Sequence, residues 1–294
     1  MSRVVSFGEI LWDKLPFGKV PGGAPLNFAY RLNSFQNSLS IISKVGDDLL
    51  GKELRAFLKK NKLDTEHIQI SKVRKTGEVN VAIDKNGIAD YNILNPVAWD
   101  NINYNSKIEK LVKNCSIFVF GSLICRNITS RETLKELLKI APFKLFDVNL
   151  RSPYYNLNLI EELMVSSDFI KFNLEEITEI SSIYSKKKTS LERMIKKISK
   201  KTKTANICVT MGEKGACYYT NKSFYFQDGF KIKVLDTIGA GDSFLATLIE
   251  GILNNTKPQE VLKKACAVAA IVASKKGATA IVSVGEINDL IGKK

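Results

Sequence analysis

One aspartate stands next to two glycines at a point where the chain could bind an anion. Residues 236–244 read DTIGAGDSF, so Asp242 follows Gly239 and Gly241, and the apolar-periodic run FLATLIEGIL predicts a helix directly afterwards. Glycines permit positive φ angles, which let successive N–H groups point into one concavity, and the N-terminus of the helix adds a positive dipole. Such a concavity suits a phosphoryl group during its transfer.

The role of Asp242 has two interpretations. A carboxylate at the rim of an anion hole is unfavourable for simple anion binding, because the two negative charges repel. It becomes useful as a general base, which takes the proton from a hydroxyl group that attacks phosphorus. The same residue would also be an ordinary N-cap of the predicted helix. This segment alone leaves both interpretations open.

Residues 46–53, GDDLLGKE, have the spacing of a phosphate-binding P-loop without its chemistry. Glu53 occupies the position of the Ser or Thr whose hydroxyl would bind Mg²⁺, and Asp47 and Asp48 would repel the phosphates. We therefore expect a structural role, in which the first glycine ends a strand, an aspartate caps the next helix and Gly51 permits close packing.

The same GAGDSF segment contains half of the dinucleotide-binding fingerprint G-x-G-x-x-G. Phe244 replaces its third glycine, and Asp242 would stand where the pyrophosphate binds. The pattern therefore disfavours a nicotinamide-dependent dehydrogenase.

The elements that must position these residues follow a regular rhythm, in which apolar, β-branched runs alternate with helical periodicities. Strands are predicted at 4–11, 39–46, 116–123, 143–150, 168–173, 206–212 and 231–235. Helices are predicted at 24–35, 48–61, 130–141, 158–167, 174–183 and 244–253. This alternation predicts one α/β domain over residues 1–294, with a mostly parallel central sheet covered by helices on both faces.

Two stretches break this rhythm. Residues 13–21 and about 76–98 resemble short alternating strands, the second with a KNG turn at 85–87. We expect them to form a small antiparallel β lid over one edge of the domain.

Composition and charge limit the classes of partner. The chain has 294 residues, of which 45% are hydrophobic, and 44 Lys and Arg against 30 Asp and Glu give a net charge of +14. The lysines lie on the polar side of predicted helices without interleaved aromatic residues, so we expect a solvated face rather than nucleic-acid binding. Part of the excess could favour an anionic small-molecule substrate.

Membrane insertion and export are not expected. The longest apolar stretch, at 265–273, is less than half of a membrane span, and the N-terminal apolar run is too short for a signal peptide. We therefore expect a cytoplasmic protein with no membrane partner.

Cysteine and histidine usage argues against several kinds of chemistry. The five cysteines are odd in number and contain no CxxC pair, so we expect buried small hydrophobic residues rather than metal ligands or disulfides. His67 is the single histidine, and no G-x-S-x-G motif stands elsewhere to form a Ser-His-Asp triad with it.

Four motifs together resemble one enzyme family. DTIGAGDSFLA resembles the C-terminal signature of the pfkB (ribokinase-like) carbohydrate kinases, and PGGAPLNFA at 21–29 resembles their GG-x-x-x-N sugar-binding signature. NLEE at 173–176 matches their N-x-x-E motif, and VTMGEKGA at 209–216 resembles their nucleotide-binding strand and loop. The resemblance covers essentially the whole chain. It implies a three-layer α/β/α ribokinase-like fold and ATP-dependent phosphorylation of a free sugar at a primary hydroxyl.

The resemblance implies roles in catalysis and sugar binding. The general base would be Asp242, and the γ-phosphate would be held by the backbone of Gly239, Ala240 and Gly241. The sugar hydroxyls would be bound by Asp13, Gly22, Gly23 and Asn27.

It likewise implies roles in nucleotide and metal binding. Mg²⁺ would be organised through water by Asn173 and Glu176, one helical turn apart. The nucleotide phosphates and ribose would be bordered by Thr210, Gly212 and Gly215, and a monovalent cation such as K⁺ would bind at Asp236 and the carbonyl of Ile238.

The segment FDVNLRSPYY at 146–155 resembles the D-x-N-x-R-x-P run of fructokinase-like members, which makes fructose the leading substrate. Arg151 would bridge the sugar and the γ-phosphate, or form a structural salt bridge with Asp147 or a neighbouring residue. Alternative substrates, used by related kinases, are 2-keto-3-deoxygluconate, ribose or a nucleoside. The side chains of Asp13, Tyr91 and Asn92 would determine which of these substrates binds. A non-catalytic sugar sensor on the same fold is a further alternative.

Cys266 departs from the family pattern. It stands in KKACAVAA, where members commonly have an asparagine near the adenine. Because cysteine is a weak hydrogen-bond partner, we expect a looser choice of nucleotide. The lid strands would also allow a homodimer to form by pairing across a two-fold axis.

Overall fold

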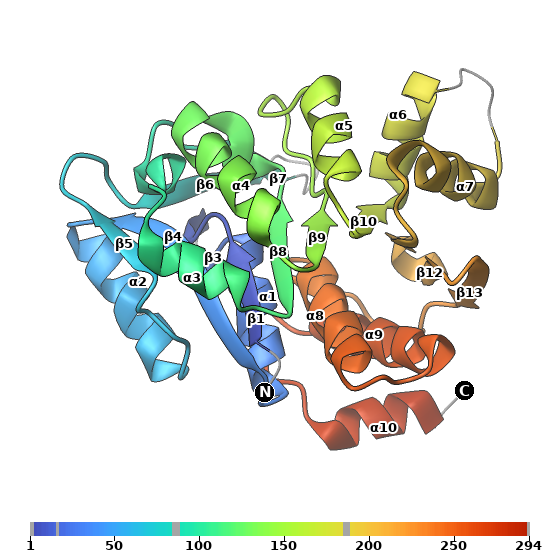
Figure 1. Ribbon diagram of the computed structural model, residues 1–294. Helices are drawn as coiled ribbons and strands as arrows, with labels where there is room; N and C mark the ends of the chain where they lie inside the picture. The colour runs from blue at the N-terminus through green and yellow to red at the C-terminus, as the bar shows by residue number, and fades with distance from the viewer. Residues whose placement is uncertain (1–2, 16–17, 84–88, 185–188, 293–294) are drawn as a thin grey trace. The chain divides into compact units, whose positions relative to one another are not determined.

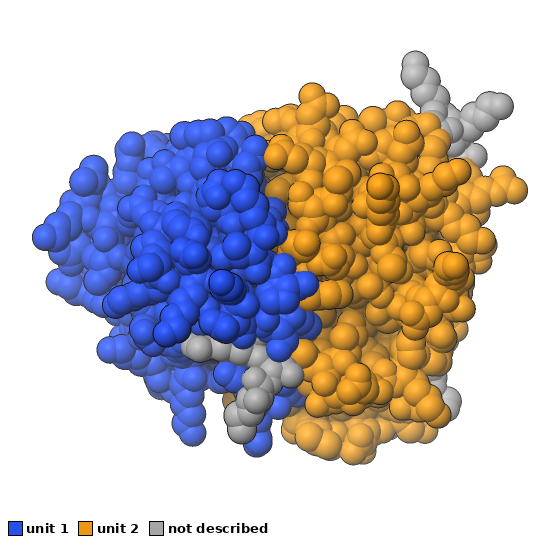
Figure 2. Space-filling view, in the orientation of Figure 1, with its two compact units in different colours: residues 1–118, 123–142 blue, residues 119–122, 143–294 orange. Residues whose placement is uncertain are grey.

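The computed structural model describes residues 3–15, 18–83, 89–184 and 189–292 (Figure 1). The chain divides into two compact units, which Figure 2 colours separately. The first comprises residues 1–118 and 123–142, and the second comprises residues 119–122 and 143–294. The division passes through strand β8 (Ile117–Gly121).

The first unit contains a parallel β-sheet with the strand order β1-β4-β5. Its strands are β1 (Arg3–Phe7), β4 (Ser38–Gly46) and β5 (Ile68–Ser71), and its helices are α1 (Ala24–Ser34), α2 (Leu49–Lys60), α3 (Ser106–Lys113) and α4 (Ile128–Ile140). Eight of the nine residues of β4 are buried, as is typical of a parallel strand covered on both faces.

The structure confirms the structural interpretation of residues 46–53. The side chain of Asp48 caps helix α2 by accepting the N–H of Gly51 at 2.7 Å. A Cβ at Gly51 would collide with the carbonyl oxygen of Gly46, so the two segments pack as closely as predicted. The P-loop spacing is therefore a coincidence of a strand end and a helix cap.

The first unit also contains the predicted lid, with one correction. Strands β2 (Leu11–Leu15) and β3 (Gly18–Gly22) pair antiparallel, and so do β6 (Gly77–Ile83) and β7 (Ala89–Ile93). However, β2 and β6 pair parallel to each other, so the four-stranded lid is a mixed sheet rather than an antiparallel one. The KNG turn at 85–87 and the side chain of Tyr91 lie outside the described residues.

A buried ion pair fixes the chain that follows the lid. The short helix η1 (Ala98–Asn101) begins where the predicted lid segment ends. Arg126 contacts Asp100 at 2.7 Å, donates to the carbonyl of Leu94 at 2.6 Å and lies 3.9 Å from the ring centre of Trp99. A guanidinium can make all these contacts at once because it is planar and carries five donors.

The second unit contains the strand order β9-β10-β11-β12-β13. The first three strands, β9 (Lys144–Asp147), β10 (Phe169–Asn173) and β11 (Asn206–Thr210), are parallel. The antiparallel edge consists of β12 (Ala216–Thr220) and β13 (Ser223–Gln227). The helices are α5 (Leu157–Val165), α6 (Leu174–Tyr184), α7 (Leu191–Thr202), α8 (Ala240–Leu253), α9 (Pro258–Ala273) and α10 (Val284–Gly292). In Figure 1, α5, α6 and α7 lie above the strands and α8 and α9 lie below them, which confirms the predicted α/β class.

One strand prediction is wrong. The alternating run KIKVL at 231–235 contains no strand residues in the structure. Its apolar side chains, Ile232 and Val234, instead line a cavity of the second unit. Lys231 lines the same cavity, and Leu235 is 57% exposed, so the alternation does not separate a covered face from an exposed one.

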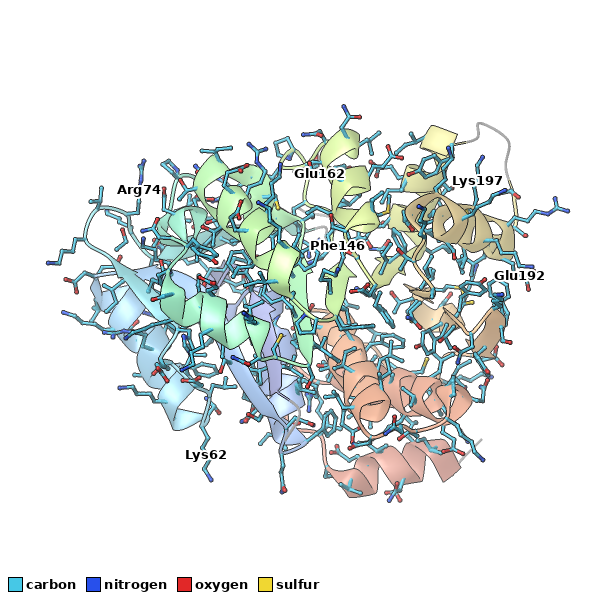
Figure 3. All side chains as sticks on the ribbon, viewed as in Figure 1. Lys62, Arg74, Phe146, Glu162, Glu192 and Lys197 are labelled. Atoms are coloured by element: carbon cyan, nitrogen blue, oxygen red, sulfur yellow. The ribbon has the colours of Figure 1, made fainter. Side chains whose placement is uncertain are left out.

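The cysteines and the lysine-rich helices lie as predicted from the sequence. All five cysteines are buried. On α7, Met194, Ile195 and Ile198 are buried and Lys196 and Lys200 are exposed. In Figure 3, Phe146 lies inside the structure while the side chains of Lys62 and Arg74 point outward. Among the described residues, no helix combines the length and apolar character that a membrane crossing requires.

Candidate active site

Helix α8 begins at a sharp turn that only glycine can form. Gly239 is its N-cap and has a φ angle of 75°, in the left-handed region. An added Cβ would lie 2.6 Å from the Cα of Ala278. The N–H of Ala240 donates to the carbonyl of Thr237 at 3.2 Å, and the N–H of Gly241 belongs to the first turn, where amides have no intrahelical acceptor. The glycine turn is therefore formed in the structure, and its binding of a phosphate stays a prediction.

The position of Asp242 excludes one of the two interpretations of this residue. Because the N-cap is Gly239 and the helix starts at Ala240, Asp242 is the third helical residue rather than the cap. The N-cap interpretation is therefore wrong. The half-buried carboxylate still lies in the first turn, where the helix dipole stabilises negative charge.

Lys171 is a residue of this region that the sequence reasoning missed. It lies on β10 with 6% of its surface exposed, and its Nζ contacts the Oδ1 of Asp147 at 2.9 Å. An added Cβ at Gly241 would lie 3.5 Å from this Nζ, so the ammonium is adjacent to the first turn of α8. A lysine inside the otherwise apolar strand DFIKFN was the available signal.

Opposing effects act on the pKa of Lys171. Burial lowers this pKa and is the largest single effect. The negative charges of Asp147, Glu176 and Asp242 together outweigh burial, so the pKa of Lys171 is raised and its ammonium stays charged.

Asn173 and Glu176 are brought together as predicted, and they also cap a helix. The Oδ1 of Asn173 accepts the N–H of Glu176 at 2.8 Å, and the Oε2 of Glu176 accepts the N–H of Asn173 at 2.7 Å. The other Glu176 oxygen accepts the N–H of Leu150 at 3.0 Å. Burial raises the pKa of Glu176, and the charge of Lys171 opposes this effect.

Arg151 does not form the salt bridge that was one of its two predicted roles. The carboxylate of Asp147 instead accepts a hydrogen bond from Lys171, its register neighbour on β10. Arg151 is exposed, and its Nη1 donates to the carbonyl of Leu150 at 3.0 Å. Its substrate-bridging role stays a prediction.

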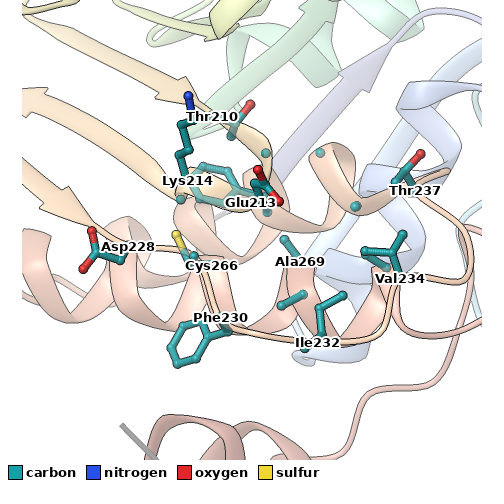
Figure 4. Close-up of a pocket in the computed structure, with 18 of the residues that line it drawn as sticks. Thr210, Glu213, Lys214, Asp228, Phe230, Ile232, Val234, Thr237, Cys266 and Ala269 are labelled. Atoms are coloured by element: carbon teal, nitrogen blue, oxygen red, sulfur yellow. The ribbon is translucent and has the colours of Figure 1, made fainter.

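A cavity of about 800 Å³ in the second unit collects the predicted nucleotide residues (Figure 4). Thr210, Gly212, Gly215, Gly241 and Cys266 all line it. The sequence reasoning missed much of the remaining wall, which includes residues 228–232, Val234 and the α9 residues Ala269, Ala270 and Ala273. These residues are mostly apolar, as is typical of a site for a flat aromatic ring.

The carboxylate of Asp236 links two loops. Its Oδ1 accepts the N–H of Ile238 and its Oδ2 accepts the N–H of Gly277, both at 2.9 Å. These bonds hold the segment before Gly239 against residues 277–278. The predicted binding of a monovalent cation to Asp236 and the carbonyl of Ile238 stays a prediction.

The four predicted sugar-binding residues come together in the first unit. An added Cβ at Gly22 would lie 2.7 Å from the Cγ of Asp13, so only glycine lets this carboxylate lie across β3. Gly23 is the N-cap of α1, and its carbonyl accepts the N–H of Asn27 at 3.0 Å. Short polar side chains and glycine backbone groups of this kind suit the hydroxyl groups of a sugar.

Comparison with known proteins identifies the family of the chain. The sequence profile described as pfkB family carbohydrate kinase matches residues 6–284. Fructokinase-2 of Solanum lycopersicum is 30% identical over 310 residues, which cover 94% of this chain and 91% of the relative.

Solved structures extend the comparison. A sugar kinase from Pyrococcus horikoshii in complex with ATP is 28% identical, with a TM-score of 0.80 and 97% coverage of both chains. A Vibrio cholerae fructokinase in its fructose, ADP and potassium ion bound form has a TM-score of 0.85, covering 99% of this chain and 98% of that one. At 22% identity, the second similarity concerns the fold alone, which is the predicted ribokinase-like fold.

Proposed function

Because the chain belongs to the pfkB family of carbohydrate kinases, we propose that it transfers the γ-phosphate of ATP to a primary hydroxyl of free fructose. The observation that carries this proposal is the first turn of α8, where Gly241 lines the 800 Å³ cavity and Asp242 directly follows it. A positive helix end and a carboxylate in one turn provide an anion site and a base in the same place.

Asp242 is the proposed general base. It takes the proton of the sugar hydroxyl as the oxygen attacks phosphorus, and the amide of Gly241 stabilises charge on the transferring group. Arg151 is proposed to bridge the sugar and the phosphate with its planar charge.

The nucleotide is proposed to occupy the cavity of the second unit. Its base packs against the apolar wall that includes Ile232, Val234 and Ala269, and its phosphates extend toward Thr210 and Gly241. Cys266 offers only a weak hydrogen bond on this wall. We therefore expect GTP and other triphosphates to replace ATP more readily than in family members that have an asparagine at this position.

The donor set beside the cavity fits a divalent cation held through water. Glu176 and Asn173 offer oxygen atoms, which hard cations prefer. Each Glu176 oxygen accepts one backbone N–H, and a carboxylate oxygen has a second acceptor position for water. When bound, Mg²⁺ supplies positive charge to the nucleotide phosphates. Asp236 and the Ile238 carbonyl are the proposed contacts of K⁺.

Fructose is supported by the residues in the first unit and by the names of relatives. Asp13, Gly22, Gly23 and Asn27 are the proposed contacts of its hydroxyls. The tomato relative is named a fructokinase, and the V. cholerae structure is described as fructose-bound.

A coupled ADP-release screen tests the proposal. The acceptors are fructose, ribose, glucose, 2-keto-3-deoxygluconate and adenosine, each with MgATP, and the expected result is the highest kcat/KM with fructose. Asp242→Asn, purified in parallel, shows whether a contaminating kinase contributes. A higher kcat/KM with another free acceptor would show that fructose is not the preferred substrate. Phosphorylated sugars are assayed alongside, and activity confined to them would overturn the substrate class.

A further inference from the structure

The proposed reaction gives no role to the buried ammonium of Lys171, which lies next to the first turn of α8. Lys171, Asp147 and Glu176 are 6%, 6% and 5% exposed, so their charges are hardly screened by water. Removing an ammonium from water is unfavourable, and a good ion pair only partly offsets it. An apolar pair would give comparable stability in the middle of a sheet, so stability alone does not explain this lysine.

The topology directs the ammonium toward the reaction site. Asp147 ends β9, and Lys171 is its register partner on β10, near the carboxyl ends of parallel strands where ligands bind in α/β sheets. The 2.9 Å contact with Asp147 holds the end of the lysine side chain in one place. The 3.5 Å spacing from an added Cβ at Gly241 puts Nζ against the turn that forms the anion site.

The groups facing this ammonium come from four elements. Asp147 of β9, Glu176 of α6 and Asp242 of α8 attract it, and the buried thiol of Cys208 on β11 also interacts with it. The helix dipole contributes only about half a positive charge at this end of α8. Lys171 adds a full charge, and the same attraction favours the ionised carboxylate of Asp242.

We propose that Lys171, held by Asp147, is a positioning residue that keeps Asp242 ionised and in place and adds positive charge behind the anion-binding turn. It acts through α8 and its first turn rather than by contact with the sugar. This inference rests on the proposed function, because it assigns a further part of the same phosphoryl-transfer site.

The test separates this role from a structural one by a double substitution. Lys171→Met removes the charge with little change of volume but leaves Asp147 buried and unpaired, so stability should fall. Lys171→Met combined with Asp147→Asn removes both charges, and we expect its thermal stability to return toward that of the wild type. Its kcat should nevertheless stay roughly 10²-fold below wild type, the usual effect of losing one preorganised charge or donor.

Two further readouts would not respond to a purely structural lysine. The KM values for ATP and sugar should stay within about threefold of wild type, because the charge acts mainly on the transition state. The acid limb of the profile of kcat/KM against pH should move to higher pH in the double variant, because Asp242 has lost the cation that favours its ionised form. Recovery of both stability and kcat in the double variant, with an unmoved acid limb, would overturn the proposal.

Failure of the proposed function would look different. If the wild type releases no ADP with any sugar, calorimetry can measure two affinities of the wild type. One is for ADP alone, and the other is for ADP together with aluminium fluoride, which mimics the transferring phosphoryl group. We expect the mimic to bind more tightly, and this preference to drop at least tenfold in the double variant. An equal preference in both proteins, or none in the wild type, would overturn the role of Lys171.

Discussion

Asn173 and Glu176 each accept the backbone N–H of the other, at 2.8 and 2.7 Å, and so close the start of helix α6. The spacing that suggested a magnesium site is thus also that of a capping box. We expect Asn173→Ala to lower the free energy of unfolding by about 0.5–2 kcal/mol, the usual effect of removing an N-cap. Denaturant unfolding measures this change.

Glu176→Gln separates the two tasks of this pair. The amide can still accept one of the two N–H groups, so the loss of stability should be moderate. The Mg²⁺ concentration for half-maximal activity should rise several-fold, because the negative charge is removed. An unchanged Mg²⁺ dependence would leave Glu176 with the capping role alone.

Asp242→Asn should lower kcat by roughly 10²–10⁴-fold, the range for loss of a general base, while ATP binding persists. Because Asp242 is not the N-cap of α8, the melting temperature should change little. Glu250→Gln is a matched control, since it makes the same chemical change in the same helix, at a residue that bonds Lys264. A kcat near that of the wild type in Asp242→Asn would contradict the assignment.

Gly239→Ala should lower stability by roughly 1–3 kcal/mol and strongly reduce activity, because the left-handed φ of 75° is strained for alanine and its Cβ meets Ala278. Gly277→Ala serves as the comparison. Gly277 also has a positive φ, of 80°, but an added Cβ there meets nothing within 4 Å. Urea unfolding should therefore show a larger decrease in the free energy of unfolding for Gly239→Ala than for Gly277→Ala. Equal decreases would mean that the backbone shifts enough to remove the contact between the added Cβ and Ala278.

Acid should weaken the attachment of helix α10. Glu286 bonds the ammonium of Lys275 and the N–H of Ser283, and these bonds lower its pKa from 4.5 to about 2. A carboxyl whose pKa is lowered by folding contributes stability that is present above its unfolded pKa and lost as the pH falls through the folded value. Hydrogen exchange of the α10 amides should accelerate between about pH 4.5 and 2, relative to the amides of α9. In Glu286→Gln the exchange should already be fast at neutral pH, and a wild-type profile in this variant would refute the role of the contact.

The order of elements could be predicted from the sequence because burial leaves a local periodic pattern. The run LSIISKVG reads as a buried strand and became β4, and the helix after DTIGAGDSF became α8. The run KIKVL shows the limit of this reasoning. Its alternation predicts a strand, but the segment is irregular, and Lys231 lines the same cavity as Ile232 and Val234. In a run this short, periodicity alone does not show which side chains are covered or whether a strand forms.

The candidate site divides in the same way. The sequence by itself determined the residue types: glycines where the backbone must turn sharply, an aspartate beside them, and the four motifs that identify the family. Tertiary structure alone decided that Gly239 rather than Asp242 caps α8, that β2 and β6 run parallel, and that Asp147 pairs with Lys171 rather than Arg151. These outcomes depend on which segments the fold brings side by side, and a charge pair between two strands leaves no periodic trace in either of them.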